Sequence, residues 1–260
     1  IAERQGFKGI RWMKMTDPSG TEAPSKVGSF LIWQQPHLIY LAELLYRANP
    51  SEELLKKYNS LIQETAEFMY SFATYEEEHD RYVLKGAIPA QETLRAAETV
   101  NPPFELSYWH FAMQVAQTWR ERTGMERVPE WEVLIEKLSP LAYNDEQLYL
   151  AAETAVDTYK DIRFTSDHMA VLGAVGILPM NQLIHAGYMK NTLHWIWDNW
   201  NWDKTWGWDY PMTAMNAARM GEPEKAVSAL LMDKRTNIWQ TVTITRTGVC
   251  VFTCPATVDY

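Results

Sequence analysis

The sequence has few cysteines, no long apolar run and no cluster of metal-binding side chains. Only two cysteines occur in 260 residues, Cys250 and Cys254, so a disulfide framework is not expected to stabilise the fold. No apolar run reaches about 18 residues, the length that a membrane-spanning helix needs. No His, Cys or carboxylate cluster has metal-ligand spacing, so we expect neither a metal nor another cofactor.

Positive charge is also scarce. Lys and Arg number 24 against 33 Asp and Glu, which gives a formal net charge of −9, and the basic residues form no stripe. Nucleic acid and anionic membrane surfaces are therefore poor partners. The chain begins with Ile1 and shows no signal peptide, which leaves its localisation open between the cytoplasm and the periplasm or exterior. Nothing in the sequence indicates an oligomeric state.

Tryptophan, in contrast, is abundant. The chain has 12, and six of them lie between Trp195 and Trp208. A rigid indole with a polar N–H suits a surface that is apolar on its face and wet at its edge. Sugar rings present apolar C–H faces rimmed by hydroxyl groups and match such a surface. Packing between large helices is the alternative for any single Trp, but the cluster as a group favours a carbohydrate-binding surface.

From about residue 35 to 235 the pattern predicts helices joined by loops. Apolar residues recur with helical spacing after Pro36, and Asn49 is expected to cap a second helix with Pro50 at its first position. Two long helices joined this closely predict an antiparallel hairpin. Further helices are expected after Pro103, from Pro129, from Asp167, over 192–200, from Asp209 or Tyr210 to Gly221, and from Pro223 to Leu231. Residues 77–87 indicate a small β excursion.

Helical hairpins with long connecting loops are typical of an α/α toroid, in which the loops at one end surround a central pocket. The loops "GFKGIRWMKMTDPSGTEAP", "RYVLKGAIPAQET" and "WDYPMTAMNAARMGEPEKAVSALL" resemble those of six-hairpin (α/α)6-barrel glycoside hydrolases. The resemblance covers residues 5–235 and is to the glycosidases related to the maltose and kojibiose phosphorylase family (glycoside hydrolase family 65-like). It implies an all-α fold in which residues 1–237 form a partial (α/α)6 catalytic barrel. A full toroid has twelve helices and the pattern predicts about eight, so we expect the C-terminal part of a longer protein.

The C-terminal segment differs in character from the rest of the chain. Residues 238–260 are rich in β-branched side chains and hold both cysteines. A shifted reading frame with suitable codons encodes "NGHNYQDGRLRVYLPGNGG", which resembles the segment that follows this hairpin in the family. The hypothesis is a frameshift after about Asn237, and the alternative is an ordinary terminal β-hairpin. The nucleotide sequence decides between them.

The resemblance implies specific catalytic groups. Inverting glycosidases use a carboxylic acid that protonates the leaving oxygen and a carboxylate, about 6.5–9.5 Å away, that activates water. "PAQE" matches the family's "GPDE", so Glu92 corresponds to the proton donor. Glu105 is the rival, although its place in the first turn of a helix is expected to lower its pKa. Asp209 is the candidate base, with a helix N-cap as its alternative role. The matching phosphorylase loop holds phosphate with His and hydroxyl residues, so an acid at this position favours hydrolysis.

The remaining candidates are groups that could bind sugar hydroxyls or stack on sugar rings. They are Arg11, Trp12, Glu22, Trp33, Gln34, Gln35, His37, Trp109, Asp167, His168, Trp206 and Trp208. Capping and packing are the alternative roles for Asp167 and the histidines.

The sequence thus predicts a glycoside hydrolase that cleaves an oligosaccharide by inverting acid–base catalysis. Two alternatives remain open. One is a catalytically inactive carbohydrate-binding or structural toroid fragment. The other is a polysaccharide lyase, in which Tyr108 and His110 would be the base. The sugar, its linkage and its anomer are not indicated.

Overall fold

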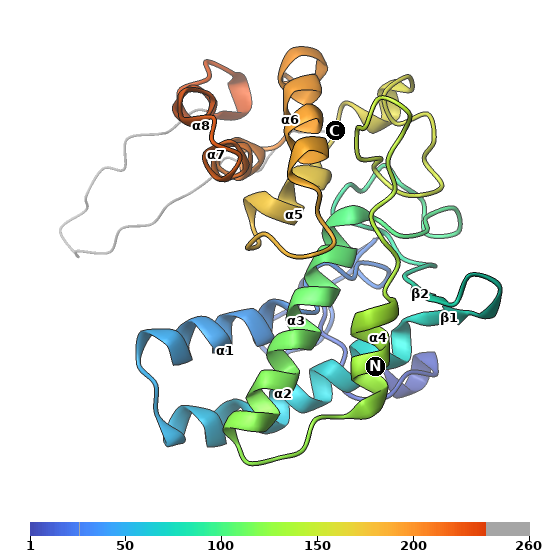
Figure 1. Cartoon of the computed structure of the whole chain (residues 1–260), viewed down its shortest axis with the longest axis vertical. Helices are drawn as coiled ribbons and strands as arrows, with labels where there is room; N and C mark the ends of the chain where they lie inside the picture. The colour runs from blue at the N-terminus through green and yellow to red at the C-terminus, as the bar shows by residue number, and fades with distance from the viewer. Residues whose placement is uncertain (26, 238–260) are drawn as a thin grey trace.

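A computed structural model describes residues 1–25 and 27–237 of the chain (Figure 1). Within these residues the chain forms eight α-helices, several short 3-10 turns and one small two-stranded sheet. The all-α prediction and its small β excursion are therefore confirmed. Both cysteines and the proposed change of reading frame lie outside the described residues. In the described part, no helix combines the length and the apolar character needed to cross a membrane.

The first two helices form the hairpin that the sequence predicts (Figure 1). Helix α1 spans His37–Ala48 and α2 spans Glu52–Phe72. The N-cap of α2 is Ser51 rather than Asn49, because the Ser51 hydroxyl accepts a hydrogen bond from the Leu54 backbone N–H at 3.2 Å. The cap therefore lies two residues later than predicted.

Helix α3 (Pro103–Arg122) is the centre of the molecule and is buried on most of its sides. Trp109 and Trp119 from this helix lie fully inside the core. The helix packs against α1 and α2, against α4 (Pro129–Lys137), and against α5, and so connects the two halves seen in Figure 1. A helix whose apolar residues lie on several faces is stable when neighbouring elements cover those faces.

The other half consists of four helices: α5 (Gly173–Gly176), α6 (Ala186–Asn199), α7 (Asp209–Arg219) and α8 (Pro223–Leu230). A Cβ atom on Gly176 would lie 2.4 Å from the Met212 carbonyl oxygen, so only glycine permits this approach of α5 to α7. The predicted start of α7 at Asp209 is confirmed. The helix predicted from Asp167 begins later, as a 3-10 turn over Ala170–Leu172 that runs into α5, because the Asp167 carboxylate binds distant loops instead of capping a helix.

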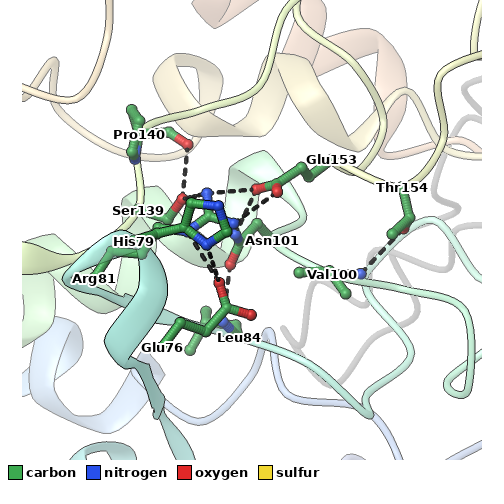
Figure 2. A network of polar contacts seen from close by, with 10 residues as sticks. All are labelled: Glu76, His79, Arg81, Leu84, Val100, Asn101, Ser139, Pro140, Glu153 and Thr154. Carbon is green, nitrogen blue, oxygen red and sulfur yellow. Dashed lines mark hydrogen bonds and ion pairs between the residues drawn. The ribbon is translucent and has the colours of Figure 1, made fainter.

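A short hairpin lies at one side of α3. Strand β1 (Thr74–Glu76) pairs antiparallel with β2 (Arg81–Val83), and Tyr75 lies opposite Tyr82. A polar network centred on Arg81 joins this hairpin to the loops before α3 and after α4 (Figure 2). The Arg81 guanidinium donates to both Glu153 carboxylate oxygens, at 2.8 and 3.0 Å, and to the Ser139 hydroxyl at 2.9 Å.

The same network fixes the entrance to α3. Glu153 also accepts from the Asn101 amide at 2.7 Å, and the Asn101 side-chain oxygen accepts from the Leu84 backbone N–H at 2.9 Å (Figure 2). Asn101 has a φ of 53°, which asparagine tolerates better than most residues. The start of α3, two residues later, is therefore held by the Glu153 side chain from the loop after α4 and by the Leu84 backbone after β2.

Candidate functional site

Two partly exposed indoles lie beside one imidazole, and a third indole is stacked on one of them. The Trp33 and Trp208 rings are stacked at 6.4 Å with an interplanar angle of 21°, and the His168 ring lies 4.3 Å from Trp208 and 5.3 Å from Trp206. We call Trp33, Trp206 and Trp208 the indole platform. Two members of the sequence cluster, Trp200 and Trp202, are buried in the core instead. The cluster predicted from sequence thus divides into a platform and packing residues.

Helices α1 and α3 border the platform through a second pair of rings. The Trp33 ring meets His37 edge-on at 5.2 Å, and the Tyr108 hydroxyl lies 2.6 Å from His37 Nδ1. Burial lowers the pKa of His37 and raises the pKa of Tyr108. A phenol with a raised pKa is a poor base near neutral pH, and His110 is itself buried with a lowered pKa. This geometry disfavours the lyase alternative.

Asp209 lies at the first position of α7 and is fully buried, with 0% of its surface exposed. Both carboxylate oxygens are 3.1 Å from His168 Nδ1, and one also accepts from the Trp206 backbone N–H at 2.9 Å and from the Thr205 hydroxyl. Its oxygens are thus occupied by protein donors. Asp209 is therefore not where it could activate a water molecule directly. It is also not the N-cap residue of α7, because it is already the first residue of that helix.

Asp167 ties the loop of Glu92 to this group. Its two carboxylate oxygens accept from the Thr93 backbone N–H at 3.1 Å and from the Trp206 indole N–H at 2.9 Å. Glu92 therefore lies one residue from a direct contact with the loop that carries His168. A series of contacts thus links the backbone next to Glu92 with Asp167 and Trp206, and the His168 ring lies against Trp206.

Glu92 itself is paired with a lysine that the sequence did not single out. Lys14 Nζ lies 2.6 Å from Glu92 Oε1, and the two side chains are 30% and 32% exposed. An ion pair exposed to water to this extent contributes about 1 kcal/mol or less to stability. The Glu92 carboxyl is therefore accessible and only weakly held.

Glu105 behaves differently from the prediction. It is 0% exposed, and burial raises its pKa to about 7, against the opposing hydrogen bond from the Ala90 backbone N–H. The expectation that a helix start would lower this pKa is wrong, because burial outweighs the dipole. Oε1 accepts from Ala90 at 2.6 Å, and Oε2 is buried with no partner among the described residues. A carboxyl that is fully enclosed cannot touch a saccharide. Glu105 instead holds the loop of Glu92 through its hydrogen bond from the Ala90 backbone N–H.

Several predicted binding residues have structural contacts instead. The Gln35 amide oxygen and nitrogen both bond the Trp12 backbone, at 2.7 Å each, and the Gln34 amide donates to the Trp12 and Leu31 carbonyls at 3.2 Å. Arg11 donates to the Gln5 side chain at 2.6 Å and to the Ser29 carbonyl. These groups shape the 5–35 loops rather than face a ligand.

Two further candidates lie away from the platform. The Trp109 indole N–H donates to the Met69 carbonyl at 3.0 Å inside the core. Glu22 is exposed and bridges Thr16 through its backbone. Among residues 1–25 and 27–237, no group of three or more His, Cys, Asp or Glu side chains is arranged to hold a metal ion.

Comparison with known proteins identifies a solved structure of similar fold. No family model matches the sequence, and no curated protein matches it. Among solved structures, the chain is similar to one described as "Putative kojibiose phosphorylase from human microbiome", with a TM-score of 0.66 and 10% sequence identity. The match covers 88% of this chain, which spans 38% of that neighbour's length. At this identity the likeness shows the fold alone, and it confirms an incomplete helical toroid.

Proposed function

We propose that the chain carries the saccharide-cleaving site of a carbohydrate-active enzyme, and that it hydrolyses a glycosidic bond in an oligosaccharide. The observation that supports this most is the double hydrogen bond of Asp167 to Thr93 and Trp206. It ties the backbone next to Glu92, whose carboxyl is accessible, to the loop that holds the His168–Asp209 pair, and this supports a site shared by Glu92, His168 and the indole platform. Apolar ring faces beside carboxyl and imidazole groups suit a sugar ring and the bond at its edge.

Glu92 is the proposed proton donor to the leaving oxygen. Its partner Lys14 holds it through an ion pair worth about 1 kcal/mol or less at this exposure, so a bound saccharide displaces the ammonium at small cost. Glu105 is excluded from this role by its complete burial.

Phosphorolysis is the second candidate, and the printed name of the structural neighbour is what favours it. Against it, α7 begins with the fully buried Asp209, whereas the resemblance implies His and hydroxyl residues that hold phosphate at this position in the phosphorylases. The two reactions differ in their product, a free sugar or a sugar phosphate.

One assay separates these functions. The 260-residue chain is incubated with a panel of α- and β-linked disaccharides, with and without inorganic phosphate, and products are read by NMR. We expect free sugar of inverted anomeric configuration, independent of phosphate. A sugar phosphate formed only with phosphate indicates phosphorolysis. Binding of a saccharide without any turnover indicates the inactive carbohydrate-binding alternative.

A further inference from the structure

Building on the proposed function, we propose that His168 is the catalytic base that takes the proton from the attacking water, and that Asp209 is the positioning residue that holds its imidazole. The Asp209 carboxylate is fully buried, so it cannot meet a water molecule in the site. His168 is the group through which this carboxylate can act.

The hydrogen-bond pattern fixes which imidazole nitrogen is free. A carboxylate only accepts hydrogen bonds, so His168 Nδ1, which lies 3.1 Å from both Asp209 oxygens, is the donor. In the neutral form of this imidazole, which carries one proton, Nε2 is then left with an unprotonated lone pair. The Thr205 hydroxyl and the Trp206 backbone N–H hold Asp209 from the other side.

Nε2 of His168 keeps access to the site. The residue is 7% exposed. Among the described residues no hydrogen bond reaches Nε2, and Nε2 is not among the polar atoms that are both fully buried and without a partner. His110 provides the contrast, since its Nδ1 is buried without a partner and its Nε2 faces the Gln182 amide at 3.0 Å. Of these two buried imidazoles, only His168 combines an orienting carboxylate with an open nitrogen.

The indole platform places this nitrogen beside the proposed sugar position. The His168 ring lies against Trp208 at 4.3 Å and against Trp206 at 5.3 Å with an interplanar angle of 27°, so its plane is fixed by two neighbours. Trp33 extends the same surface from the end of the loop before α1. A sugar stacked on these indoles therefore lies next to Nε2.

The resulting step balances. The water oxygen attacks the anomeric carbon while the bond from that carbon to the leaving oxygen breaks. Nε2 takes a proton from the water and becomes part of an imidazolium, whose charge Asp209 stabilises. Glu92 gives its proton to the leaving oxygen and becomes a carboxylate. Solvent then carries the proton from the imidazolium back to Glu92, and the net change is addition of one water.

Kinetics of variants of the 260-residue chain test this role. His168→Ala is expected to lower kcat about 100-fold or more, since a positioned base contributes roughly that much. Sodium azide should restore turnover and yield a glycosyl azide of inverted configuration, because azide needs no base. Asp209→Asn should lower kcat with little change in KM. The proposal is overturned if a folded His168→Ala chain hydrolyses the substrate at the wild-type rate. It is also overturned if this variant loses hydrolysis and azide does not restore turnover.

The tautomer of His168 gives a second test that needs no turnover. Long-range proton–nitrogen NMR of the wild-type chain should show Nδ1 protonated and Nε2 unprotonated, and Asp209→Asn should move the proton to Nε2. A wild-type Nε2–H tautomer overturns the inference. If the wild-type chain hydrolyses no glycoside, the proposed function fails and the base role with it. If it hydrolyses and only Glu92→Gln is inactive, the function stands and His168 is not the base.

Discussion

The backbone N–H of Thr93 donates to Asp167 Oδ2 at 3.1 Å, although 74 residues separate them in the chain. This bond joins the loop of Glu92 to the loop of His168, as does the bond from the Gln91 side-chain amide to the Phe164 carbonyl at 2.9 Å. Asp167 uses its other oxygen for the Trp206 indole, so one carboxylate orders three loops from different parts of the sequence. The proposed chemistry depends on this junction more than on any single candidate residue.

The indole platform is expected to supply saccharide affinity. Trp208→Ala removes the ring that lies between Trp33 and His168, and we expect the Kd for saccharide to rise about tenfold, which corresponds to about 1.4 kcal/mol. Titration followed by calorimetry measures this. Trp197→Ala is the matched control, because that ring faces Lys225 at 5.1 Å and does not belong to the platform. Equal weakening by both variants contradicts a binding role for the platform.

Buried Glu105 makes stability depend on pH. Its pKa of about 7 in the folded chain lies above the ordinary 4.5, so folding favours its neutral form. The stabilisation is fully present below about pH 4.5 and is lost as the pH rises to about 7. Glu105→Gln removes this dependence, and its stability relative to the wild type should improve by on the order of 3 kcal/mol between pH 4.5 and pH 8.

Urea unfolding of both chains at the two pH values measures this difference, since the other titrating groups are shared and largely cancel. A stability difference that stays constant between the two pH values shows that Glu105 does not titrate in this range.

The network at the entrance to α3 should be a stability determinant. Arg81→Gln leaves the partly buried Glu153 without its guanidinium partner, and we expect the free energy of unfolding to fall by roughly 1–3 kcal/mol. Lys56→Gln, at an ion pair with Glu52 in which both side chains are at least 80% exposed, is the control and should change it by less than about 0.5 kcal/mol. Similar small losses in both variants speak against a positioning role for Arg81.

The weak pair of Lys14 with Glu92 leads to a separate expectation. Lys14→Met should leave the free energy of unfolding within about 1 kcal/mol of the wild type. Hydrolysis should persist, because the ammonium is displaced when a saccharide binds. Chemical denaturation and steady-state kinetics on the same sample test both points. If the activity of Lys14→Met is as low as that of a Glu92 variant, Lys14 takes part in the reaction, which contradicts this expectation.

Local signals in the sequence predict much of the helical fold. Pro103, Pro129 and Pro223 begin helices as expected, and α7 begins at Asp209. These starts depend on residues that are neighbours in the chain, so proline and side-chain propensity are sufficient.

The site could be predicted only in part, because its contacts join distant residues. Glu92, Asp167, His168 and the platform were named from sequence, but nothing indicated that Asp209 would bind His168 41 residues away, or that Lys14 would pair with Glu92 across 78 residues. The pKa of Glu105 also reversed its expected direction, since burial by tertiary packing outweighed the local helix dipole. Charge and burial at a site are set by tertiary neighbours, which a single sequence does not specify.

The most direct measurement compares Glu92→Gln with the wild-type chain on one saccharide, with turnover and binding read on the same preparation. We expect turnover to fall by about 100-fold or more while the Kd changes by less than about threefold, because the amide keeps the shape and loses the transferable proton. An aryl glycoside with a strongly acidic leaving group, which needs no protonation, should regain most of its rate. A Glu92→Gln chain that cleaves the natural linkage at the wild-type rate contradicts the account.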